Sequence, residues 1–309
     1  MSNSSGLVSV IMNCFNGEKY LREAIDSAIS QTYQNLEIIL WDNRSTDKSS
    51  SIVKSYADSR IKYFLADEFT SLGEARNLAI KKSKGEFIAF LDVDDIWFAT
   101  KMEKQVALFN DPKVGIVISD TIFFNEKGDF KQLYKNEKPP VGEVFAELLK
   151  SYCVSLETIA VRKSYLDQMD YWFDSRFSMI EEMDFLLRLS KISQLAYVDE
   201  PLAKWRMHNQ SWTYEKRSLF PVERKQMIET YSKIIPDFRN TYSESIQSIL
   251  KLAALEESIV FFQKGEIAEM RSKIEPFILK DKKYLVLYLL SFMPKGMVRS
   301  VLTKRGILV

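Results

Sequence analysis

The sequence has little of several residues that mark particular classes of protein. It contains one histidine and two cysteines in 309 residues. Cys14 and Cys153 stand in apolar surroundings without the spacing of metal ligands, which excludes a cysteine-based metal site and indicates a reducing compartment. Lysine plus arginine number 43 and aspartate plus glutamate 42, so the nearly balanced charge gives no field that would attract nucleic acid.

Long hydrophobic runs and nucleotide-loop motifs are missing as well. The longest apolar run, residues 284–293, is about half of the ~20 residues that span a membrane. Residues 1–7 are polar and uncharged, unlike a secretory signal, so we expect a cytoplasmic protein. No Gly-x-Gly-x-x-Gly follows the first predicted strand, which disfavours a dinucleotide-dependent oxidoreductase, and the lack of a Gly-Lys-Ser/Thr loop excludes an NTPase of that class.

The sequence does contain a buried strand that ends in acids. Residues 87–91 are five consecutive apolar residues, and Asp92, Asp94 and Asp95 follow them. Such a run is typical of a strand covered on both faces, and open α/β sheets bind ligands at the carboxyl ends of such strands. Asp92 and Asp94 can face one divalent cation that also holds substrate phosphates. The alternative is that these acids only cap the helix that follows.

Strands and helices alternate through the first 215 residues, which predicts an α/β fold with a parallel sheet covered on both faces. We predict strands at 8–12, 36–41, 61–65, 87–91, 114–119, 121–124, 156–161, 195–198 and 202–205. We predict helices at 20–28, 74–84, 101–110 and 181–191, and a mobile polar loop at 125–142. Beyond residue 215 helical periodicity dominates.

The order and spacing of these motifs resemble the nucleotide-sugar-binding half of family 2 glycosyltransferases, which have the GT-A fold. The resemblance covers residues 7–212. It implies a doubly wound, mainly parallel, Rossmann-like sheet in residues 1–215, with a helical C-terminal region in 216–309. It also implies an inverting hexosyl-type transferase of bacterial surface polysaccharide synthesis. Such an enzyme takes a nucleotide sugar, with a UDP-sugar expected, and a glycan or lipid-linked acceptor.

The resemblance also assigns the nucleotide-sugar and metal sites. It places Phe15, Asn16 and Asp42 at the nucleoside, Arg76 near the nucleotide, Asp92 at the ribose and Asp94 on a Mn²⁺ or Mg²⁺ ion. In the same way Trp205-Arg206-Met207-His208 resembles a segment in which Arg206 contacts the nucleotide sugar and His208 either coordinates the cation or meets the diphosphate. As alternatives, Asp42 is a turn residue, Arg76 is salt-bridged and His208 is a structural group.

The general base comes from the same resemblance. Glu181-Glu182-Met183-Asp184 opens a helix where the family keeps a Glu-Asp pair, and the base position is Glu182, with Asp184 as the second candidate. A Glu can transfer the same proton with a longer reach. The alternative is that these acids only favour the positive N-terminus of the helix.

Two other function classes stay open. A nucleotidyltransferase also uses a nucleotide, a cation and a doubly wound sheet, but it normally carries a glycine-rich phosphate loop. A catalytically inactive nucleotide-sugar-binding module is favoured by three departures from the family. These are Asn13 in place of Pro, Asn43 in place of a second acid, and Glu182 in place of Asp.

The C-terminal tail is basic and partly apolar. Residues 280–309 contain seven basic residues and one acid, which gives +6 in a chain of net charge +1. Residues 284–293 are apolar, and Met297, Val298, Val301 and Leu302 fall on one helical stripe. This pattern predicts peripheral binding to an anionic membrane on its cytoplasmic face. The alternative is packing on the catalytic domain or on a second copy, as a homodimer.

Overall fold

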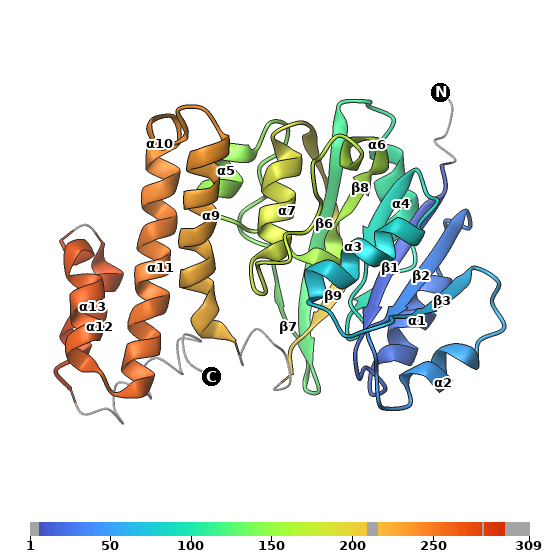
Figure 1. The fold of residues 1–309 in the computed structure, drawn as a ribbon, viewed down its shortest axis with the longest axis horizontal. Helices are drawn as coiled ribbons and strands as arrows, with labels where there is room; N and C mark the ends of the chain where they lie inside the picture. Colours follow the sequence, from blue (N-terminus) through green and yellow to red (C-terminus); the bar gives the residue numbers. More distant parts are fainter. Residues whose placement is uncertain (1–5, 209–215, 280, 294–309) are drawn as a thin grey trace. The chain divides into compact units, whose positions relative to one another are not determined.

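The computed structural model describes residues 6–208, 216–279 and 281–293 (Figure 1). The chain divides into two compact units, Met1–Ser211 and Trp212–Val309, where we expected a boundary at 215. The tail stripe predicted from Met297 to Leu302 lies outside the described residues.

The first unit is built on one nine-stranded mixed sheet, in the order β3-β2-β1-β4-β8-β6-β9-β5, with β7 paired to β6. The strands that run parallel at one end are β1 (Val8–Cys14), β2 (Leu36–Asp42), β3 (Ile61–Leu65) and β4 (Phe87–Phe90). The others are β5 (Ile96–Trp97), β6 (Val114–Asn125), β7 (Gly128–Gln132), β8 (Ala160–Arg162) and β9 (Gln194–Arg206). β8 is antiparallel to β4 and β6, whereas β6 and β9 are parallel. The expected α/β fold is confirmed.

Helices cover both faces of this sheet, so its inner strands are buried on both sides. Alternate side chains of a strand point to the same face of the sheet. On one face Val10 of β1 and Ile38 of β2 pack with Leu21 and Ile25 of α1 in one core. The side chains on the other face, such as Ile11, are buried as well, and α3 packs against the same two strands. The helices of this unit are α1 (Leu21–Ile29), α2 (Ser49–Lys54), α3 (Leu72–Lys82), α4 (Lys101–Leu108), α5 (Phe145–Lys150), α6 (Lys163–Leu166) and α7 (Glu181–Ser190).

Three predictions of strand and loop boundaries, in the segments of β6, β7 and β9, were wrong. β6 is one strand where we predicted two with a break at Asp120. The buried Asp120 carboxyl is satisfied by the backbone N–H groups of Thr121 and Tyr134, at 2.8 and 2.9 Å, and by the Gln132 amide. The predicted loop 125–142 contains β7, and β9 joins two predicted strands through an irregularity in register. Two of the three donors to Asp120, Gln132 and Tyr134, come from the following segment of the chain, and a local pattern cannot show such partners.

The second unit is helical in its described part. Its helices are α9 (Phe220–Ile234), α10 (Phe238–Thr241), α11 (Ser243–Lys264), α12 (Ile267–Ile274) and α13 (Lys282–Leu290). Ile259 and Phe262 of α11, Met270 of α12, and Tyr284 and Leu287 of α13 form its small core. No helix in the described residues is long and apolar enough to cross a membrane.

A buried polar contact fixes the start of β4. The Ser9 hydroxyl donates to Glu37 at 2.6 Å and accepts from the backbone N–H of Gly85 at 2.8 Å. Glu37 also accepts from the backbone N–H of Lys84 at 2.6 Å. Added to Gly85, a Cβ would lie 2.6 Å from the backbone nitrogen of Ser9 and 2.7 Å from the carbonyl oxygen of Phe87. The backbone approach therefore requires a glycine here.

We expect Gly85→Ala to lower the free energy of unfolding by about 1–3 kcal/mol, because the added methyl group forces two strands apart. Gly73→Ala is the matched control, since its Cβ meets other atoms at 3.4 Å or more in a helical position. The control should leave stability unchanged or raise it by about 0.5–1 kcal/mol. Urea unfolding measures both. Equal stabilities of the two variants would contradict the close approach at Gly85.

Candidate active site

The side chains that the sequence assigned to a nucleotide-sugar site come together at one edge of the sheet. Phe15 and Asn16 follow β1, Asp42 ends β2, and Asp92 and Asp94 follow β4. These three strands are adjacent and parallel, so their carboxyl ends meet. Open α/β sheets bind ligands at this edge.

The loop after β1 is held to the loop after β2 by Asn16. Its backbone has φ 52°, a left-handed conformation that Asn tolerates better than most residues. Its side-chain oxygen accepts from the backbone N–H of Thr46 at 2.8 Å, and its own N–H donates to the Ser45 hydroxyl at 3.0 Å. Asp42 accepts from the backbone N–H of Ser45 and from the Tyr63 hydroxyl, each at 2.7 Å. Both residues therefore shape the loops as well as lining the edge.

Asn43 holds a third loop, which carries an aromatic side chain that the sequence analysis missed. Its amide donates to the carbonyl of Thr70 at 2.9 Å and accepts from the backbone N–H of Thr70 at 3.2 Å. The neighbouring Phe69 lies with its ring centroid 4.8 Å from that of Phe15, and both rings are about half exposed. An aromatic residue in the loop after the third parallel strand was the available signal.

A buried arginine joins the strand edge to the acidic helix. Arg76 of α3 is 2% exposed and donates to Asp92 at 3.2 Å and to Glu181 of α7 at 2.9 Å. The Phe173 ring lies 5.4 Å from its guanidinium carbon. Two carboxylates on one buried guanidinium fix the positions of β4, α3 and α7 at the site. The sequence analysis placed Arg76 at the nucleotide and missed its partner Glu181.

Asp94, Arg206 and His208 form a second group at the same edge. His208 Nε2 lies 2.9 Å from Asp94 Oδ2, and its Nδ1 is buried without a hydrogen-bond partner in the described structure. Arg206 donates to the backbone carbonyl of Asp94 at 2.8 Å and to Glu23 at 2.6 Å, and its guanidinium carbon lies 4.3 Å from the Tyr20 ring. Arg206 therefore holds the backbone that presents Asp94, and its predicted contact with the nucleotide sugar stays a prediction.

The described residues contain no cluster of three or more His, Cys, Asp or Glu side chains that could hold a metal ion. One oxygen and one nitrogen ligand, from Asp94 and His208, fit a cation whose remaining ligands come from substrate phosphates and water, as is usual for Mg²⁺. The sequence prediction of Asp94 and His208 as ligands is compatible with this geometry and stays a prediction.

Glu182 has an unusual environment for a surface helix terminus. It is partly buried in the first turn of α7, and within the described part of the chain its carboxyl makes no hydrogen bond or ion pair. Burial, and after it the charge of Glu181, raises the pKa of Glu182 to about 8, although Arg76 opposes the shift. A carboxyl without a protein partner and with a pKa near neutrality has the properties of a general base.

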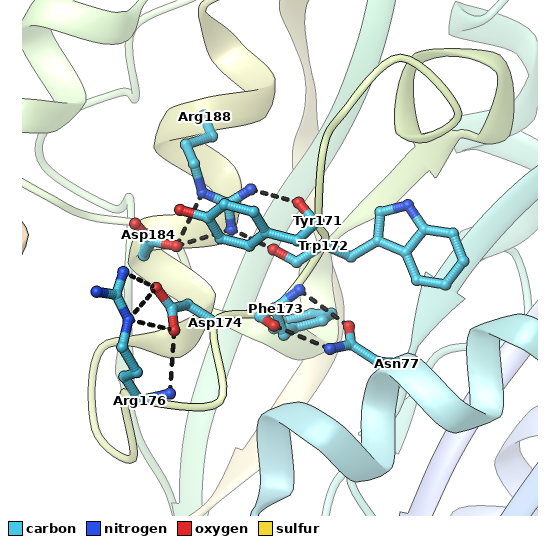
Figure 2. A network of polar contacts seen from close by, with 8 residues as sticks. All are labelled: Asn77, Tyr171, Trp172, Phe173, Asp174, Arg176, Asp184 and Arg188. Carbon is cyan, nitrogen blue, oxygen red and sulfur yellow. Dashed lines mark hydrogen bonds and ion pairs between the residues drawn. The ribbon is translucent and has the colours of Figure 1, made fainter. Parts of the chain in front are cut away.

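Asp184 lies two residues further but has a different environment (Figure 2). It is 1% exposed and accepts from Arg188 Nε at 2.9 Å, and Arg188 also donates to the backbone carbonyls of Tyr171 and Trp172. Asn77 of α3 holds the next residue, Phe173, through two 2.9 Å hydrogen bonds. Asp184 therefore positions the segment that places Phe173 against Arg76.

A further buried acid was not identified from the sequence. Glu157 lies in a short 3₁₀ helix, Leu156–Thr158, that precedes β8, and β8 pairs antiparallel with β4, the strand before Asp92. Glu157 is 2% exposed; its Oε2 accepts from Ser155 at 2.6 Å, and its Oε1 has no partner among the described residues. Burial raises the pKa of Glu157, and the charge of Asp92 contributes to this shift. The signal was an acid inside the apolar segment that we predicted as strand 156–161.

Known proteins resemble this chain in sequence. A family model described as "Glycosyl transferase family 2" matches residues 9–169. An uncharacterized glycosyltransferase of Rickettsia typhi is 32% identical over 219 residues, which are 68% of this chain and 66% of that protein. The Escherichia coli enzyme named UDP-Glc:alpha-D-GlcNAc-diphosphoundecaprenol beta-1,3-glucosyltransferase WfgD is 30% identical over 184 residues, 60% of this chain and 69% of its own length. The chain spans 66%, 65% and 35% of the length of three Rickettsia relatives that it matches.

Solved structures resemble it in fold. Staphylococcus aureus TarS 1-349 in complex with UDP-GlcNAc has a TM-score of 0.67 at 20% identity, over 88% of this chain and 80% of that one. The mannosyltransferase PcManGT of Pyrobaculum calidifontis, in complex with GDP-Man and Mn²⁺, has a TM-score of 0.60 at 14% identity, over 96% and 86% of the two chains. Because the family model matches more than half of the residues, including the ends of β1, β2 and β4 at the candidate site, the chain belongs to glycosyl transferase family 2.

Proposed function

We propose that this protein transfers a sugar from a nucleotide sugar, with a UDP-sugar as the donor, to a hydroxyl of a glycan or lipid-linked acceptor, with inversion at the anomeric carbon. The observation that carries the proposal is the carboxyl of Glu182, which has no hydrogen-bond or ion-pair partner among the described residues and lies near the Arg76–Asp92 ion pair at the candidate ligand edge of the sheet. Two E. coli relatives are named as enzymes that use UDP-Glc and a GlcNAc-diphosphoundecaprenol acceptor, which supports both substrate classes.

The nucleotide end of the donor fits the loops after β1, β2 and β3. The exposed Phe15 and Phe69 rings offer faces on which a base can stack, and Asp42 ends β2, the strand next to β1. The ribose and diphosphate would then extend toward Asp92 and Asp94. A divalent cation, when bound at Asp94 and His208, would neutralise the negative charge that grows on the departing diphosphate.

The acceptor end needs a base on the opposite side of the reacting carbon. In our proposal Glu182 accepts the proton of the attacking hydroxyl, and the sugar is transferred in one displacement that inverts its configuration. Arg76 pairs with both Asp92 and Glu181 and offsets part of their negative charge, which favours the ionised form of Glu182. No covalent intermediate with the protein is required.

The direct test is an assay of UDP-sugar turnover with and without an acceptor. Release of UDP together with a glycosylated acceptor supports the proposal. A protein that binds UDP-sugars tightly but never turns them over would instead be a binding module.

Alanine at Phe15 or at Phe69 should weaken UDP binding by about 1–3 kcal/mol, because each substitution removes a stacking face for the base. Isothermal titration calorimetry measures this loss. Phe130→Ala is the control, since Phe130 is also about half exposed but lies on β7. Unchanged UDP affinity in both loop variants would contradict the placement of the base.

Turnover should require a divalent cation. Chelation with EDTA should abolish transfer, and Mn²⁺ or Mg²⁺ should restore it, because Asp94 and His208 provide only two protein ligands and the diphosphate needs a counter-charge. Asp94→Asn should weaken Mn²⁺-dependent UDP binding in calorimetry more than metal-free binding. Full turnover in chelator by both the wild type and Asp94→Asn would contradict the cation site.

Glu182→Gln should keep UDP-sugar binding and lower turnover by about two to four orders of magnitude. In the wild type kcat/KM should rise with pH through about 8, because the base works when ionised and burial raises the pKa of Glu182 to about 8. The variant should lose this rising limb. The comparison variant Asp184→Asn should mainly lower stability, since it removes the partner of Arg188. Near-normal turnover in Glu182→Gln, with a folded but inactive Asp184→Asn, would move the base to Asp184.

A further inference from the structure

The second unit presents a helix that is apolar on two faces. Tyr284 and Leu287 of α13 point into the small core with α11 and α12. On the outward face Leu289 is 58% and Phe292, just past the helix, 62% exposed. Leu285, Val286 and Met293 are exposed on the same side, at helical spacings of three and four residues. Single exposed apolar residues are ordinary, but a continuous stripe of them marks an interaction surface.

Basic residues lie beside this stripe. Lys282 and Lys283 are exposed at the start of α13, and the Arg271 guanidinium carbon lies 3.6 Å from the Phe292 ring centroid. Asp281, the nearest acid in sequence, is already paired with Lys251. In sequence the chain after Met293 adds four basic residues and no acid. The surface thus combines an apolar stripe with a positive border.

This combination favours an anionic partner over a second copy of the chain. A twofold contact would place the same basic border of each copy against the other, and like charges oppose such an interface. An anionic lipid surface attracts the border and accepts the stripe into its apolar boundary. We propose that the α13 stripe, defined as Leu285, Val286, Leu289, Phe292 and Met293, docks this protein peripherally on an anionic membrane.

Vesicle flotation tests the proposal with the full-length protein and no substrate, so its outcome is independent of sugar transfer. The protein should float with phosphatidylcholine vesicles that contain one third phosphatidylglycerol, and binding should weaken steeply with salt. The double variant Leu289→Gln/Phe292→Ser should bind at least tenfold more weakly, because it removes two exposed apolar side chains from the stripe. Lys282→Glu/Lys283→Glu should bind more weakly and with a smaller salt dependence.

The matched control is Ile234→Gln, which changes an apolar residue 57% exposed on α9 of the same unit. It should float like the wild type. Circular dichroism and thermal unfolding verify that all variants fold, which is expected because the substituted side chains face outward. Flotation of the stripe variant equal to wild type, equal binding to vesicles without phosphatidylglycerol, or a wild type that does not float would each overturn the proposal. So would a stripe-dependent dimer, seen by light scattering, without vesicle binding.

Discussion

The ion pairs of one buried arginine are the contact on which the rest of the site depends. Arg76 comes from α3, Asp92 follows β4 and Glu181 begins α7, so a single guanidinium ties together three elements that are far apart in the sequence. Breaking a buried pair by removing one partner typically costs about 3–5 kcal/mol, because a charge is left without compensation. Because Glu182 adjoins Glu181 in the sequence, this contact also fixes where Glu182 lies at the site.

The site is short of positive charge. Besides the partly buried Asp92 and the buried Glu181, the acids at this edge include the buried Asp95 and Glu157, and burial raises the pKa of each of these two. An excess of carboxyl groups in a low-dielectric setting stabilises bound protons and cations, and it is the physical reason that a base with a pKa near neutrality can exist here. The same excess would repel a diphosphate without a cation. The proposed proton transfer and the proposed cation binding therefore depend on the same excess of carboxyl groups.

Much of the candidate site was accessible from the sequence because it follows strands. An apolar run that ends in Asp92 and Asp94 identifies both a buried strand and its ligand edge, since side-chain alternation and strand ends are local properties. Glu157, Phe69 and the Arg76–Glu181 pair were not accessible in this way. Their importance arises from register and loop contacts between distant segments, such as the Asn43–Thr70 hydrogen bonds that hold the loop of Phe69.

The sequence by itself determined the α/β class, the helical character of the C-terminal region and the candidate ligand edge of the sheet. The reason is that hydrophobic periodicity and strand ends are properties of neighbouring residues. Only the tertiary structure decided what the polar residues do. Asp184 and Glu182 look equivalent in the sequence. In the structure Arg188 forms an ion pair with Asp184, whereas no described side chain pairs with Glu182. In the same way the sequence pattern predicts that a strand ends before Asp120, but Asp120 lies inside the continuous strand β6. Partners brought from distant parts of the chain set the role of a buried polar group, and no local pattern contains them.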